Sequence, residues 1–371
     1  MTLRITDGRM YRSMSDLLGA AMSRIGSLQR QVATGRRLAH PSDDPLATMQ
    51  AQALQARMTD NQRYQDNVAD AISWSAATEP VLQTLHELLT KIHETILRGG
   101  DEAVHDRTTL AQSVDDMLEE MVAQANTRMG DRYLFAGYDD RTAPYASATQ
   151  VTGETVRMAA PGTAVDLANA RLVAGSLVLT DPVSGTLYTE GVDYREDGAT
   201  GRVEVMAGGG LSAGQDVRAS YTTATISSVR ATGPLGGDMV RQIGRDRSTV
   251  INLTGPQVFA AGGDLFQLAI DIKNALWKDD PATVRSLGVQ VGKALDHMGG
   301  VLGLVGSRAA TLESEQKLLE SDAMALEEYL SNVRDANLAE VMMRLQAEQT
   351  AYQAALASTA RVLQSSLADH L

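Results

Sequence analysis

Both ends of this chain carry long, heptad-like runs of apolar residues, and this pattern limits the possible folds more than any other feature of the sequence. Apolar side chains that recur at steps of three and four lie along one narrow stripe of a helix. Such a stripe is buried by another helix rather than by a broad globular core. We therefore expect a coiled-coil-like pairing of long terminal helices. The stripe residues are Met14, Leu18, Ala21, Ile25, Leu28 and Val32 at the start, and Leu326, Leu330, Val333 and, after a phase slip, Met342, Leu345, Tyr352, Leu356 and Leu363 at the end.

The two terminal runs carry opposite charges. Residues 1–37 hold seven arginines against two aspartates, whereas residues 312–371 hold ten acidic against four basic residues. Opposite charge favours pairing of the first helix with the last, in one chain or between copies, but an exposed ion pair adds only about 0.2 to 1 kcal/mol. Apolar burial must supply the rest. We expect residues 1–40 and 325–371 to be disordered or marginal in a free monomer and to fold on assembly.

Composition excludes several classes of function. A net charge of −13 argues against a nucleic-acid binder, which needs clustered lysine and arginine. The absence of cysteine removes disulfides, thiolate catalysis and cysteine-ligated zinc. Residues 1–20 lack the apolar core and cleavage site of a secretory signal peptide. No apolar run approaches the length of about 18 residues that a membrane span needs. We therefore expect no nucleic-acid partner, no membrane insertion and no cleaved signal.

The order along the chain predicts a mainly α fold with an inserted antiparallel β domain. At 371 residues, two or three domains are expected. Between residues 143 and 232, short alternating segments rich in Val, Thr and Tyr are separated by glycine-containing turns, which is typical of a small sandwich or barrel. We expect this module to stand away from the helices. The predicted parts are a terminal helical domain (1–40 plus 325–371), a helical rod (41–142 plus 233–324) and the outer β domain (143–232).

Local signals place the helix ends of the rod. Gly35 ends the first helix, and Pro45 opens the second at the position where its missing N–H costs nothing. We expect Pro80 to interrupt that helix. A third helix follows to about Gly130, then a short β segment at 246–255 and helices on either side of Asp280-Pro281, with a further break at the glycines of 299–306.

The search for catalytic or metal-binding groups finds no constellation. His86 and His93 share a helix face but lie seven residues apart, whereas helical metal ligands are spaced by three or four. Adjacent Asp43 and Asp44 fit a turn and a helix cap better than an acid/base pair. The glycines of 208–210 lack the Lys-Ser/Thr that follows a phosphate-binding loop. We expect no enzyme activity, no cofactor and no metal.

Two internal motifs carry a resemblance to a known family. The stretch 31–45 closes one helix and opens the next, and 132–145 contains Arg-Tyr-Leu-Phe-Ala-Gly-Tyr. The first resembles the segment that ends the first helix in the flagellin superfamily. The second, together with the final 365–371, is similar to the hook-filament junction proteins of that superfamily. The motif residues are Gly35, Pro41, Ser42, Asp43, Asp44, Pro45, Tyr133, Phe135 and Gly137.

The resemblance implies a structural role outside the cell. Such a protein forms a homo-oligomeric ring that adapts the hook lattice to the flagellin filament. Its implied partners are copies of itself, a hook-associated protein on the hook side, flagellin on the filament side, and a cytoplasmic export chaperone at the C-terminal helix. Export by the flagellar type III apparatus is also implied. Three alternatives remain: a flagellin-type filament subunit, a cell-surface enzyme with a catalytic or sugar-binding β domain, and a coiled-coil adhesin or scaffold.

Overall fold

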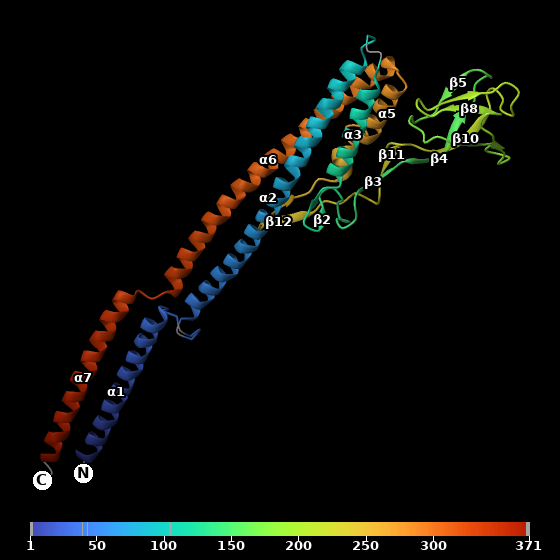
Figure 1. Ribbon diagram of the computed structural model, residues 1–371. Coiled ribbons are helices and arrows are strands. Elements are labelled where there is room, and N and C mark those ends of the chain that lie inside the picture. Colours follow the sequence, from blue (N-terminus) through green and yellow to red (C-terminus); the bar gives the residue numbers. More distant parts are fainter. Residues whose placement is uncertain (1–2, 39, 43, 104–105, 369–371) are drawn as a thin grey trace. The chain divides into compact units, whose positions relative to one another are not determined.

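The computed structural model describes residues 3–38, 40–42, 44–103 and 106–368, and the chain divides into two compact units (Figure 1). The first unit comprises the chain up to Asp66 and from Lys317 onward, and the second spans Asn67–Gln316. Long helices dominate, and antiparallel sheets occupy the middle of the sequence. This arrangement confirms the predicted fold class, a mainly α protein with an inserted β domain.

Two helix ends lie where the sequence predicts them. α1 (Leu3–Thr34) ends before Gly35, whose φ of 68° is the left-handed conformation that closes a helix, and the Gly35 N–H bonds the carbonyl of Gln31 at 2.8 Å. α2 (Pro45–Gly99) begins at the expected proline. The side chain of Asp44 accepts the N–H of Ala47 at 3.0 Å and so caps the free donors of the first turn.

Two predicted breaks are wrong. α2 runs through Pro80 as one helix of 55 residues, and α6 (Pro281–Arg334) runs through all the glycines of 299–306. A buried face continues on both sides of each site, as Trp74 and Leu82 show for α2 and Met298 and Val305 for α6. Burial of such side chains, at about 1.5 to 3 kcal/mol each, outweighs a proline cost of about 3 kcal/mol. The actual break lies at 335–337, after which α7 (Leu338–Ala368) begins.

The helical part of the second unit has one aromatic centre. α3 (Thr108–Ala125) packs on α5 (Leu265–Trp277), preceded by the short α4 (Gly255–Phe259). The three phenylalanines of the chain, Phe135, Phe259 and Phe266, join Tyr145 there with ring centroids about 5 Å apart. Two small hairpins complete this part: β1 (Arg128–Met129) with β2 (Arg132–Tyr133), and β12 (Val240–Gly244) with β13 (Arg247–Val250).

The β domain is built from two antiparallel sheets and a two-stranded neck. One sheet has the order β4-β10-β6-β7 and the other β5-β9-β8, while β3 and β11 pair separately. Their inner faces share one apolar cluster that includes Leu179, Val203, Val217 and Tyr221. The bounds are β3 Tyr145–Ala148, β4 Gln150–Arg157, β5 Ala164–Asp166, β6 Val178–Thr180, β7 Leu187–Tyr188, β8 Tyr194–Asp197, β9 Arg202–Val205, β10 Asp216–Thr222 and β11 Ser228–Ala231.

The expectation that the β domain stands away from the helices is wrong. Within the second unit, α5 contacts it directly: the Asn274 side chain accepts the N–H of Ala170 at 3.1 Å, and Lys278 Nζ donates to the carbonyl of Leu167 at 2.6 Å. The predicted apolar face of this helix, with Leu265, Leu268 and Ile272, gives no sign that polar residues at its C-terminal end also make contacts.

Candidate assembly interface

The terminal helices α1 and α7 pack side by side within the first unit (Figure 1). The structure shows two continuous helices in contact, and the expectation that they are disordered or marginal in a free monomer stays a prediction. All six stripe residues predicted on α1 are turned inward, with Ala21 and Ile25 buried and the other four half-buried. On the C-terminal side, Leu330 is buried, and Leu326, Val333, Leu345 and Tyr352 are half-buried. The two helices are therefore in contact, but few of the side chains between them are fully buried.

The phase of the α7 stripe differs from the prediction in two places. Val341, at 8 % exposure, takes the inward position that we expected for Met342, which is 58 % exposed. Leu356 is also exposed, at 43 %. The break at 335–337 resets the helix, and Val341 and Met342 both fit a step of three or four to Leu345. The side chain of Leu363 lies outside the described residues.

A charged pair links the described parts of the two helices, as their opposite charges lead us to expect. Arg24 donates through Nε to Glu348 Oε1 at 2.9 Å and through Nη2 to Oε2 at 3.3 Å. Arg24 is 56 % exposed, so solvent screening keeps the contribution to at most about 1 kcal/mol. The pair fixes which faces of α1 and α7 meet more than it stabilises them.

Both helices of the pair break at the same level, and the two breaks are joined by backbone hydrogen bonds. The Arg37 N–H bonds the carbonyl of Arg334 at 2.8 Å, and the Ala336 N–H bonds the carbonyl of Gly35 at 2.9 Å. Arg36 and Asp335 form the antiparallel bridge between them. A hydrogen bond from Arg334 holds the pKa of Asp335 below its usual value. No sequence signal predicts this joint, although Arg36 adjoins the helix stop predicted at Gly35.

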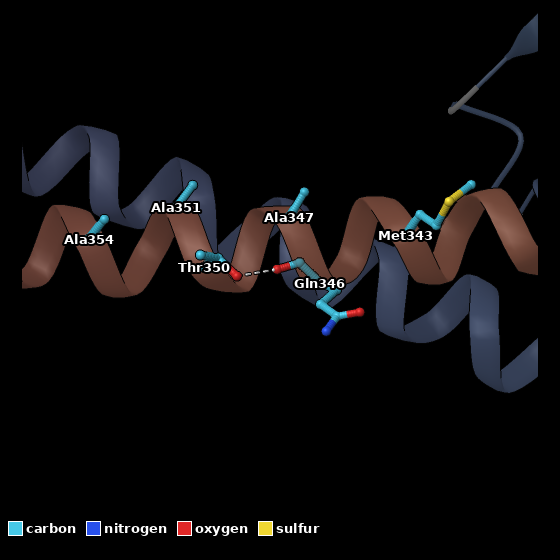
Figure 2. A pocket seen from close by; sticks show the side chains of 6 residues that line it. All are labelled: Met343, Gln346, Ala347, Thr350, Ala351 and Ala354. Atoms are coloured by element: carbon cyan, nitrogen blue, oxygen red, sulfur yellow. Dashed lines mark hydrogen bonds between the residues drawn. The ribbon is translucent and has the colours of Figure 1, made fainter.

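A shallow groove on α7 contains three alanines, and two of them, Ala347 and Ala351, also line a pocket shared with α1. Figure 2 shows Met343, Ala347, Ala351 and Ala354 pointing to one side of the helix, with the Thr350 hydroxyl bonded to the Gln346 carbonyl at 2.8 Å. Met343 is 67 % exposed. Small side chains let the backbone of another helix approach closely. On α1, Leu17 and Met22 are likewise exposed, at 67 % and 56 %.

The remaining motif residues serve the fold around the joint and the aromatic centre. Pro41 and Ser42 form an exposed turn, Pro45 is exposed at the start of α2, and Asp43 lies outside the described residues. Tyr133 is half-buried, whereas Phe135 and Gly137 are buried. A Cβ on Gly137 would stand 2.3 Å from the carbonyl oxygen of Gly236, so this close backbone approach requires glycine.

Among the described residues, no group of three or more His, Asp or Glu side chains is placed to hold a metal ion. The side chains of His86 and His93 are half-buried, and each has a buried Nδ1 without a hydrogen-bond partner. In the same described part of the chain, no helix combines the length and the apolar character that crossing a membrane requires.

The N-terminal helical region of the chain matches a known family. Residues 6–140 match the bacterial flagellin N-terminal helical region. The resemblance to the flagellin superfamily is confirmed. The flagellin-type region covers α1, α2, α3 and the Tyr133–Gly137 motif, and a separate family described only as a protein of unknown function matches residues 142–233, the inserted β segment.

Two curated relatives are named as flagellar hook-associated proteins. Flagellar hook-associated protein 3 of Salmonella typhimurium strain LT2 is 29 % identical over 150 residues, which are 40 % of this chain and 47 % of the relative. The protein of that name from Escherichia coli K12 is 33 % identical over 119 residues, covering 31 % and 38 %. The chain thus matches less than half the length of these curated relatives.

A solved structure shares the fold. A putative flagellar hook-associated protein from Vibrio parahaemolyticus superposes with a TM-score of 0.50, covering 79 % of this chain and all of the other at 14 % identity. At this identity the likeness concerns the fold alone.

Proposed function

We propose that this protein is a structural subunit of the bacterial flagellum that forms a ring at the junction between hook and filament. One observation carries the proposal: large apolar side chains stay exposed on α1 and α7 although the two helices are already paired. Among the described residues they are Leu17, Met22, Leu338, Met342, Met343 and Leu356, each 43 to 67 % exposed. Large exposed apolar side chains that gather on one pair of helices indicate a protein contact.

The proposed assembly surface is the α1/α7 pair with the joint at its inner end. The paired helices act as one element, and the stripe residues hold the pair together. The exposed side chains and the α7 groove then receive helices of neighbouring copies. This assignment extends the predicted interface outward, because Met342 and Leu356, which we predicted in the stripe, are exposed on the α1/α7 pair.

The wider assignment follows the resemblance and the names of the relatives. We infer contacts with a hook-associated protein on one side of the ring and with flagellin on the other, and chaperone binding at α7 before export by the type III apparatus. We also propose that the chain is divided into the predicted terminal domain, helical rod and outer β domain. The role is structural, without catalysis.

A strain that lacks this protein tests the proposed role. Electron microscopy is expected to show hooks without filaments, with flagellin released into the medium. Filaments of normal number and length in the deletion strain would refute a junction role. If the chain instead polymerises alone into long filaments, it is a flagellin-type filament subunit.

Charge variants of the same strain test the proposed surface. Met343→Asp and Leu356→Asp place a charge on exposed apolar positions of α7, so they are expected to leave the monomer folded and to block filament formation. Gln353→Asp introduces the same charge at an exposed polar position and serves as the control. Normal filaments with both α7 variants would show that this surface is not used.

A further inference from the structure

The two-stranded neck between the helical part and the β domain contains a bulge, which follows from its strand pairing. Thr149 alone separates β3 from β4, whereas residues 223–227 separate β10 from β11. Because both pairs of strands are antiparallel partners, the longer connection must bulge out of the ribbon. The N–H groups of Thr223 and Ser227 still bond the opposite connection, at the carbonyls of Thr149 and Ala148. The bulge is therefore ordered and points to one side.

A buried lysine receives this bulge. Lys273 on α5 is 1 % exposed, and its ammonium group donates to the Thr225 hydroxyl at 3.0 Å and to the carbonyl of Ile226. The same group pairs with Asp115 of α3 at 3.1 Å, and that carboxylate is only 4 % exposed. One cation thus joins two rod helices to the neck. Burial lowers the pKa of Lys273, and the charge of Asp115 opposes this effect.

The C-terminal end of α5 and the residue that follows it contact the β domain itself. Asn274 accepts from Ala170 N and donates to the Asn169 side chain at 3.1 Å, and Lys278 bonds the Leu167 carbonyl. The Arg171 guanidinium lies 4.8 Å from the ring centre of Trp277. These contacts all fall between residues 167 and 171, a segment separate in sequence from the neck. The β domain and its neck are therefore attached to the helices at two separate places.

We propose that Lys273 locks the neck so that the outer β domain is held in one fixed orientation on the helical rod. A two-stranded ribbon alone twists and bends easily. A buried ion pair adds little net stability compared with apolar packing, but its fixed geometry specifies one arrangement. Lys273 therefore acts as a positioning residue. The inference does not depend on the proposed assembly at the termini.

Pulsed electron spin resonance on the full chain measures this orientation directly. Because the chain has no cysteine, Val183→Cys in the β domain and Val289→Cys on α6 supply two labelling sites, 95 % and 66 % exposed. We expect one narrow distance distribution in this labelled parent. Lys273→Met combined with Asp115→Leu removes both charges, so that neither is left buried alone, and is expected to broaden or split the distribution. The exposed Lys91→Met is the control and leaves it narrow.

Amide exchange provides a second readout that separates loss of the lock from loss of the fold. In the double variant, exchange at Thr223 and Ser227 is expected to accelerate by roughly tenfold or more, the effect of losing one hydrogen bond to a charged group. Exchange in the cores of α3 and of β10 should change little. A broad distribution in the parent, or an unchanged narrow one in the double variant, would overturn the proposal. General acceleration across α3 would assign Lys273 to stability instead of orientation and would equally overturn it.

Discussion

The substitution Ile25→Ala tests how much of the terminal pair exists before assembly. Ile25 is 8 % exposed and lies in the stripe of α1 that faces α7. Leu17 lies on the same helix but is 67 % exposed. The two residues have side chains of equal size, so Leu17→Ala is a matched control that differs only in burial.

The expected magnitudes follow from these exposures. Truncation of a buried isoleucine to alanine costs about 2 to 5 kcal/mol, and a contact between only two helices collapses easily, so we expect about 2 kcal/mol. Since 1.4 kcal/mol corresponds to a factor of ten, the pair should open about thirtyfold more often. Leu17→Ala at an exposed site should change the stability of the pair by less than about 0.5 kcal/mol.

Hydrogen exchange of the α1 amides in the free monomer measures the opening. Ile25→Ala is expected to accelerate exchange along α1, and Leu17→Ala to leave it near the parent rate. In assembly the order reverses: Leu17→Ala should weaken incorporation into flagella, because that side chain belongs to the outer surface. Equal exchange in both variants, or a parent whose α1 amides already exchange like an unfolded chain, would refute the pairing in the monomer.

Two further predictions concern the second unit. Burial, followed by the nearby charge of Glu190, raises the pKa of Tyr194 to about 12. The contribution of its neutral hydroxyl to the free energy of unfolding is therefore complete below pH 10 and is lost between about pH 10 and 12. Tyrosinate absorbance should rise together with unfolding of the β domain, and it should rise less in Tyr194→Phe. Both Gly130 and Gly137 have positive φ, so Gly130→Ala should cost about 1 to 2 kcal/mol in denaturant unfolding. Gly137→Ala should destabilise the second unit by clearly more, because the added Cβ would also clash with the backbone of Gly236.

The sequence predicts which face of α1 is turned toward α7, and the reason is periodicity. Six stripe residues at steps of three and four leave one possible face, and the structure turns all six inward. On α7 the same reasoning fails at Met342. Adjacent Val341 and Met342 are both apolar, and only the position of the break at 335–337 decides which one faces α1. Backbone hydrogen bonds from Ala336 to Gly35 and from Arg37 to Arg334 set that position, and no local sequence pattern predicts them.

Helix continuity was harder to predict than helix type. Pro80 and the glycines of 299–306 are strong local signals, but each competes with a buried face that continues on both sides. The polar face of α5 presents the reverse case. Lys273 and Asn274 have the charge and polarity of a solvated surface, and only the bulged neck and the 167–171 segment show that they are covered. Pairing between distant segments, rather than local propensity, decides both outcomes.

The joint between the two helix breaks links the thin terminal pair to its proposed assembly. Two long helices with few fully buried side chains have little stability of their own, because isolated helices gain most of theirs from packing. The bonds from Arg37 to Arg334 and from Ala336 to Gly35 hold α1 and α7 in register at one end. A neighbouring copy then meets a pair whose relative position is already set, and preorganisation of this kind reduces the ordering cost of binding. Deleting one residue between Arg334 and Leu338 should therefore shift the register of α7 on α1 and impair assembly more than Asp335→Asn, which keeps the backbone bonds.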